Sequence, residues 1–151
     1  MTFDRAEILR RIDSVCGVIE QHAGWAEQHC RLHDVAFQAL VEAQVPRLFL
    51  PARLGGLEVD PVTCALVCEK LAAADTAAAW HVMVFNAARL MAAQWPEALV
   101  EQLWGSDPDT LVAASGHSPL QAVARGDGYV ISGRQRFVSG CDHGTWLLSP
   151  V

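Results

Sequence analysis

Cysteine and histidine are the residues of this sequence with the most versatile chemistry, because both can bind metals and cysteine can also react. Cys64 and Cys68 are four residues apart, so on a helix they would share one face. A structural zinc site usually needs two closely spaced ligand pairs, and Cys141 with His143 is the only second pair. We therefore predict no metal site and interpret the thiols as buried structural groups.

Motifs for phosphate binding or nucleophilic catalysis are not found. Gly126, Gly128 and Gly133 do not form a G-x-G-x-x-G motif in front of a helix. Ser115 and Ser139 are not part of a nucleophile elbow. The sequence therefore assigns no catalytic residue.

Composition excludes several classes of partner. The chain has 151 residues, of which 11 are basic and 17 are acidic, and Lys70 is its only lysine. Without clustered cations, neither nucleic acid nor an anionic membrane surface is an expected partner. Five scattered cysteines, no signal peptide and no long apolar run predict a cytoplasmic protein.

The apolar fraction of 52% is high, and two interpretations remain open. Either the chain presents apolar surface to a partner or a further domain, or it is simply rich in alanine.

Helical periodicity dominates residues 1–108. A first long helix has one apolar stripe, and a second begins near His33 with Asp34 as a possible cap. Asp60 and Pro61 predict the start of a third helix ending near Ala74. A fourth helix is expected over residues 77–93 and a short fifth over 96–105, with a tight Pro- and Gly-rich loop at 48–56. The stripe of the first helix consists of Ile8, Ile12, Val15, Ile19, Ala23 and Ala26.

Residues 109–151 predict strands. We expect strands at 110–115, 120–125, 129–137 and 145–151, with a hairpin turn at Gly126-Asp127-Gly128. The last strand is apolar up to Val151, from which we expect a chain cut inside a domain. The predicted fold class is α+β: an all-α helical domain over residues 1–108, followed at 109–151 by the first strands of an incomplete antiparallel β-barrel-like domain.

Several stretches together resemble the acyl-CoA dehydrogenase superfamily. Residues 51–56 (PARLGG) and 69–75 (EKLAAAD) are similar to its P-x-x-x-G-G and E-x-L-A-x-x-D stretches. Residues 128–140 (GYVISGRQRFVSG) are similar to its G-Y-x-x-x-G-x-x-x-[WF]-x-[ST]-G stretch. The order and spacing of the three make the resemblance fairly specific.

One branch of the superfamily fits better than the others. The dehydrogenases usually carry Thr-Glu-Pro and Gly-Ser-Asp near the first strand, where this chain has AASGHSP at residues 113–119. Residues 75–80 (DTAAAW) and 139–146 (SGCDHGTW) resemble instead the flavin-dependent monooxygenases of this fold. The resemblance implies an oxidoreductase, a flavoprotein that uses reduced flavin and O₂, with acyl-CoA dehydrogenation as the alternative.

The resemblance also implies which residues meet the cofactor, FAD or FMN. Phe137, Val138 and Ser139 correspond to the segment along the flavin ring, where an aromatic ring covers one edge and a hydroxyl bonds near N5. Ser115 corresponds to a second flavin-facing strand, although ordinary sheet packing is equally consistent. Apart from the resemblance, the tryptophans are expected in the core or at an interface, and Trp80, on the most apolar helix, is the best candidate among them for a substrate-side wall. The family's catalytic base lies in a C-terminal helical bundle, and we expect that bundle to be absent here.

The implied partners are flavin, a flavin reductase and other copies of the same chain. An opposing hypothesis is a non-catalytic truncated remnant or oligomerisation module that retains the helical domain.

Overall fold

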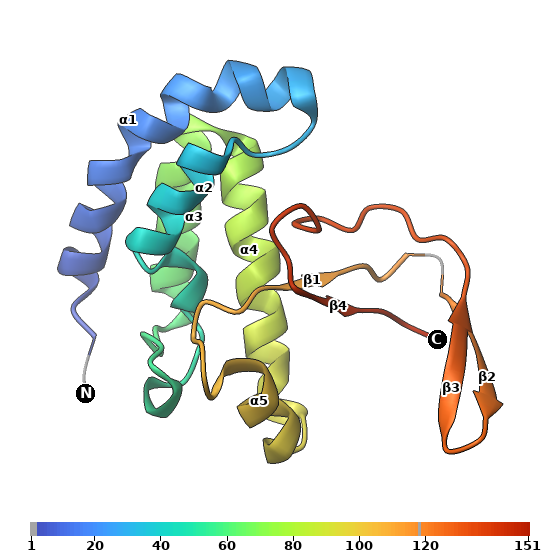
Figure 1. Cartoon of the computed structure of the whole chain (residues 1–151). Helices are drawn as coiled ribbons and strands as arrows, with labels where there is room; N and C mark the ends of the chain where they lie inside the picture. The colour runs from blue at the N-terminus through green and yellow to red at the C-terminus, as the bar shows by residue number, and fades with distance from the viewer. Residues whose placement is uncertain (1–2, 118) are drawn as a thin grey trace.

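The computed structural model describes residues 3–117 and 119–151 (Figure 1). Ser118, part of the AASGHSP stretch, lies outside the described residues. The helices are α1 (Arg5–His29), α2 (Asp34–Glu42), α3 (Pro61–Ala74), α4 (Thr76–Met91) and α5 (Glu97–Trp104). The strands are β1 (Val112–Ala114), β2 (Gln121–Arg125), β3 (Gly128–Ser132) and β4 (Trp146–Leu148).

Side-chain caps fix where α1, α2, α3 and α4 begin. The Asp60 carboxylate accepts the backbone N–H groups of Val62 and Thr63, and α3 ends at Ala74 as the sequence predicts. The predicted cap of α2 was wrong, because His33 caps the helix through its Nδ1, which accepts the Val35 N–H at 3.1 Å. Asp34 is instead the first residue of the helix, and its carboxylate pairs with Arg31 at 2.9 Å.

The helices pack into one layered block in which α3 contacts both α1 and α4. Ile12, Val67 and Leu71 are almost fully buried at these contacts. The α4 helix has apolar residues on most of its sides but is buried on one side only. Its opposite side leaves four large apolar side chains partly exposed: Trp80, Met83, Leu90 and Met91.

A buried arginine anchors the passage from helices to strands. Arg89 on α4 donates to the backbone oxygens of Pro108 and Thr110 at 3.1 and 3.0 Å. Its guanidinium also lies over the Trp104 ring, and burial lowers the pKa of Arg89 to about 10. These bonds hold the start of β1 against α4.

The strands form two separate two-stranded sheets among the described residues. The predicted antiparallel hairpin is found between β2 and β3, with a two-residue turn at Gly126-Asp127. By contrast, β1 and β4 pair in parallel, with Val112 opposite Trp146. Every residue of β2 and β3 is exposed, and Figure 1 shows this hairpin standing away from the helices.

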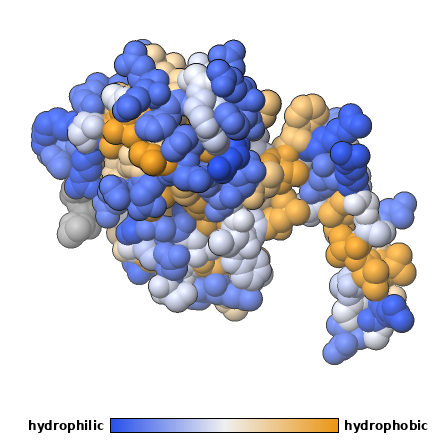
Figure 2. Space-filling view, turned by 45° about the horizontal axis from the view of Figure 1, so that its top comes forward, coloured by the Kyte–Doolittle hydropathy of each residue, from blue (hydrophilic) through white to orange (hydrophobic). Residues whose placement is uncertain are grey.

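Exposed apolar side chains gather on the strand-containing part of the molecule, where Figure 2 shows orange surface along the hairpin and next to the helices. Val123, Tyr129 and Phe137 have exposed fractions of 62, 73 and 78%. This surface favours the interpretation that the apolar composition serves contacts beyond the described fold. Among the described residues, no helix is both long and apolar enough to cross a membrane.

Candidate functional site

The structure brings the five residues singled out from the sequence to one place beside α4. The indole Nε1–H of Trp80 donates to Ser139 Oγ at 2.9 Å, across 59 positions of the chain. Ser139 also forms an isolated antiparallel bridge with Ala114, at the end of β1. The segment 137–139 therefore lies between β1 and the exposed side of α4.

Ser115 ties the two chain segments of this site together. Its side chain is buried, and its hydroxyl lies 2.8 Å from the backbone oxygen of Arg136 and 3.2 Å from that of His117. The same oxygen accepts the backbone N–H of His117 at 3.2 Å. The Ser115 hydroxyl thus has backbone partners both for its proton and for its oxygen.

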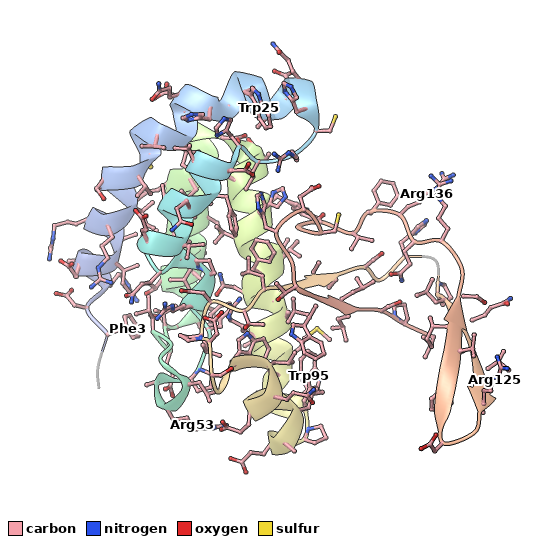
Figure 3. All side chains as sticks on the ribbon, viewed as in Figure 1. Phe3, Trp25, Arg53, Trp95, Arg125 and Arg136 are labelled. Carbon is pink, nitrogen blue, oxygen red and sulfur yellow. The ribbon has the colours of Figure 1, made fainter. Side chains whose placement is uncertain are left out.

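Phe137 has the least usual backbone of the site. Its φ is +57°, in the left-handed region that a bulky side chain rarely adopts, and such a residue costs about 1–3 kcal/mol. Its ring is exposed and meets His117 edge-on at 5.4 Å between ring centroids. Figure 3 shows the neighbouring Arg136 pointing outward from this stretch. Backbone strain of this kind is often found at functional sites, which makes Phe137 a candidate site residue.

The turn after Ser139 docks the site on the helices. Gly140 has φ +82°, and a Cβ there would lie 2.4 Å from the Phe85 ring of α4. Three residues on, the His143 ring stacks on Phe37 of α2 with 3.8 Å between centroids and 7° between planes. Burial lowers the pKa of His143 below its ordinary value of 6.5. The sequence analysis did not predict that this turn docks on the helices. The only signal for it was the Ser139-Gly140 pair at the end of the quoted motif.

An apolar groove of about 470 Å³ lies between α3 and α4, and Trp80, Met83 and Cys68 are among the residues that line it. Trp80 therefore separates this groove from Ser139. Cys64 is buried and Cys68 half-buried, and both are free thiols. Their mutual hydrogen bond lowers the pKa of Cys68 to about 7, while the bond and burial raise that of Cys64.

Metal ligands do not gather in the part of the chain that the structure describes: no three His, Cys, Asp or Glu side chains there lie close enough to hold an ion.

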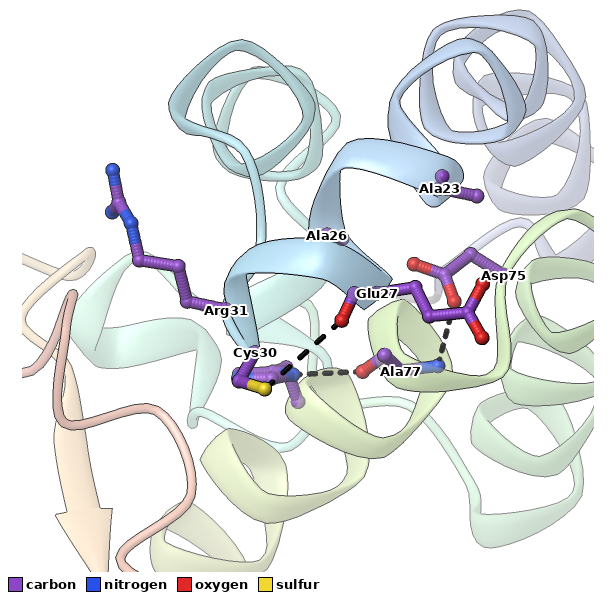
Figure 4. Close-up of a pocket in the computed structure, with 9 residues that line it drawn as sticks. Ala23, Ala26, Glu27, Cys30, Arg31, Asp75 and Ala77 are labelled. Carbon is purple, nitrogen blue, oxygen red and sulfur yellow. Dashed lines mark hydrogen bonds between the residues drawn. The ribbon is translucent and has the colours of Figure 1, made fainter.

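A second pocket of about 470 Å³ lies between the end of α1 and the start of α4 (Figure 4). None of the five residues singled out from the sequence lines it. Two of its charged groups have structural partners: Asp75 caps α4 by accepting the Ala77 N–H at 2.9 Å, and Arg31 pairs with Asp34. We therefore place the candidate site at Trp80 and residues 115 and 137–139.

Comparison with known proteins identifies the family. Residues 13–105 match the family described as acyl-CoA dehydrogenase, N-terminal domain. The oxygenase subunit HsaA of a flavin-dependent monooxygenase from Rhodococcus jostii is 29% identical over 93% of this chain and 37% of its own. The oxygenase component of p-hydroxyphenylacetate 3-hydroxylase from Acinetobacter baumannii is 30% identical over 93% of this chain and 33% of its own.

Solved structures agree with this assignment. XiaF from Streptomyces sp., in complex with FADH₂ and glycerol, has a TM-score of 0.90 and 26% identity, covering 95% of this chain and 36% of its own. The HsaA monooxygenase from Mycobacterium tuberculosis has a TM-score of 0.86 and 28% identity, covering 95% and 39%. The chain thus spans about a third of the length of these relatives.

Proposed function

Since this chain belongs to the acyl-CoA dehydrogenase family, we propose that it is the N-terminal portion of a flavin-dependent monooxygenase or hydroxylase. The observation that carries this proposal is the convergence of Ser115, Phe137, Val138 and Ser139 with Trp80 beside α4. The similar proteins are monooxygenases and hydroxylases by name, which favours this function over acyl-CoA dehydrogenation.

The chemistry of these side chains fits a flavin. Phe137 offers an exposed ring that can cover an aromatic edge, and its strained backbone holds that ring outward. Ser139 offers a hydroxyl that accepts from Trp80 and still has a proton to donate. Val138, half-buried between them, adds an apolar contact. Ser115 supports this face by holding the backbone of Arg136 in place.

A bound reduced flavin would supply two electrons, so that one oxygen atom of O₂ enters the substrate and the other leaves as water. Trp80 would form the substrate-side wall, because it lines the apolar groove on one side and bonds Ser139 on the other. The reduced flavin, FAD or FMN, would come from a separate reductase, as befits relatives named as oxygenase subunits or components.

Flavin binding by the 151-residue chain tests the proposal. Oxidised and reduced FAD and FMN are titrated anaerobically against the purified chain, and fluorescence and absorbance report binding. We expect saturable binding that Phe137→Ala weakens about tenfold, because the ring provides apolar contact area. Val123→Ala, which removes another exposed apolar side chain from the hairpin, should leave binding unchanged. A chain that binds neither flavin contradicts the proposal.

One observation favours the opposing oligomerisation module. The partly exposed side of α4, formed by Trp80, Met83, Leu90 and Met91, is apolar surface that a second copy could cover. Analytical ultracentrifugation separates the two functions: concentration-dependent association without flavin binding supports the module, and flavin binding supports the oxygenase portion.

A further inference from the structure

The Trp80–Ser139 hydrogen bond carries an inference about the orientation of the serine hydroxyl. An indole N–H can only donate, so Ser139 Oγ is the acceptor in this bond. A serine hydroxyl has one proton and two lone pairs, and Trp80 occupies one of the lone pairs. The hydroxyl proton must therefore point away from the indole.

The two serines of the site, Ser115 and Ser139, differ in whether their hydroxyl protons are available to a ligand. Ser115 Oγ is surrounded by backbone, with two carbonyl oxygens and one N–H within 3.2 Å. Within residues 3–117 and 119–151, the Ser139 hydroxyl donates to no protein acceptor. Ser139 is also more exposed than the buried Ser115. Of the two, Ser139 has the donor that a ligand can use.

The backbone at Ser139 is held as firmly as its side chain. Gly140 fits against Phe85 with no room for a Cβ, and Phe85 and Trp80 belong to the same helix. The bridge to Ala114 holds Ser139 from the opposite side. These contacts fix the Ser139 backbone, so the hydroxyl can turn away from Trp80 only by side-chain rotation that breaks the indole hydrogen bond.

We propose that Trp80 is a positioning residue for Ser139: its indole N–H fixes the serine hydroxyl as a donor directed at a bound flavin. The inference rests on the proposed function, because the flavin is the acceptor. It gives Trp80 a role beyond that of a wall, and it predicts that the indole nitrogen matters as well as the indole surface.

Four variants test this: Trp80→Phe, which keeps an aromatic ring but removes the donor, Ser139→Ala, the double variant, and Trp95→Phe as the matched control. Trp95 lies at the α5 end of the molecule (Figure 3), half-buried and stacked on Trp104. Thermal unfolding of each variant confirms that it is folded before binding is compared.

The first measurement needs no flavin. In ¹H–¹⁵N spectra of the 151-residue chain, Ser139→Ala should shift the Trp80 indole resonance and speed its hydrogen exchange, since the N–H loses its acceptor. The Trp95 indole resonance should stay in place. A Trp80 resonance that does not respond to Ser139→Ala overturns the hydrogen bond and the inference with it.

The second measurement uses FAD and FMN. Trp80→Phe should weaken binding about threefold to tenfold, the usual effect of one hydrogen bond, and shift the bound flavin's absorbance band as Ser139→Ala does. The double variant should bind no more weakly than Ser139→Ala, because the two residues act through one bond. Trp95→Phe should bind like the wild type. Wild-type affinity in Trp80→Phe, or additive losses in the double variant, overturns the inference.

Failure of the proposed function is distinguishable from these results. A wild-type chain that binds neither FAD nor FMN overturns the proposed function. The Ser139 hydroxyl then has no flavin to donate to, whatever the indole resonance shows. A wild-type chain that binds flavin while Trp80→Phe binds equally well overturns the positioning role alone.

Discussion

The helical block and the β2–β3 hairpin differ in how far their apolar side chains are buried. In the helical block, residues such as Ile12, Val67 and Leu71 are almost fully buried between α1, α3 and α4. In the hairpin, all five residues of each strand are exposed. Apolar side chains of the hairpin such as Val123 and Ile131 are nevertheless about half exposed or more, so hydrophobicity alone does not decide burial.

The difference reflects where each element finds its partners. A helix makes its hydrogen bonds within itself, and its caps and apolar stripe are local in sequence. A two-stranded hairpin leaves two open edges and is marginally stable unless another element covers it. The candidate site at Trp80 and residues 115 and 137–139 lies between the two regions, directly before the 140–144 turn that packs on α4 and α2.

The largest expected effect lies in the helical block. Leu71→Ala should lower the free energy of unfolding by about 2–5 kcal/mol, because it opens a cavity among α1, α3 and α4. Urea unfolding followed by circular dichroism measures this. A loss below about 1 kcal/mol would show that the block is less tightly packed than its burial indicates.

A smaller effect is expected where the regions meet. Gly140→Ala should cost roughly 2–4 kcal/mol, since it adds both a positive-φ strain and a clash with Phe85. Gly126→Ala is the matched control, with φ +63° but open space around its Cβ. Equal urea midpoints for the two variants would indicate that the turn is not docked on α4.

The docking turn should also respond to pH. Burial lowers the pKa of His143 below 6.5, while a hydrogen bond to the Leu32 backbone and the Asp34 carboxylate act in the opposite direction. The folded state therefore binds its proton less readily than the unfolded state, so stability is fully present above pH 6.5 and declines as pH falls below it. Thermal melts between about pH 7.5 and about pH 5 should show a decline that His143→Gln reduces.

His29→Gln is the control for the pH measurement, because His29 is an exposed histidine at the end of α1. If His143→Gln leaves the slope of stability against pH unchanged, the ring is not protected from solvent by Phe37.

The smallest effect belongs to the hairpin. Ile131→Ala should change the free energy of unfolding by no more than about 0.5 kcal/mol, because the side chain is half exposed on a hairpin of exposed strands. Amide hydrogen exchange should be fast in β2 and β3 and slow in α3. Strong protection of the hairpin amides would reveal a cover that the described fold does not contain.

Local signals made the helices predictable. Asp60 and Pro61 identify the start of α3. The helix-forming residues that follow extend the predicted helix to Ala74. The His33 cap was missed because a neutral imidazole caps a helix less often than the neighbouring aspartate would. The hairpin turn was predictable for the same local reason, since glycine accepts the positive φ that the turn needs.

Long-range contacts were not predictable in the same way. Nothing near Arg89 in the sequence indicates that its guanidinium bonds the backbone of Pro108 and Thr110. The parallel pairing of β1 with β4 joins segments more than thirty residues apart and has no turn signal. The contacts within the site are of this kind as well.

The sequence by itself determined the helices, the hairpin and the family, because caps, periodicity and motif order are local properties of the chain. It also named Trp80 and Ser139 separately. Only the tertiary structure joined them, through a hydrogen bond whose geometry depends on the packing of Gly140 against Phe85. Such a bond is set by distances between elements, and a linear pattern of residues does not encode those distances directly.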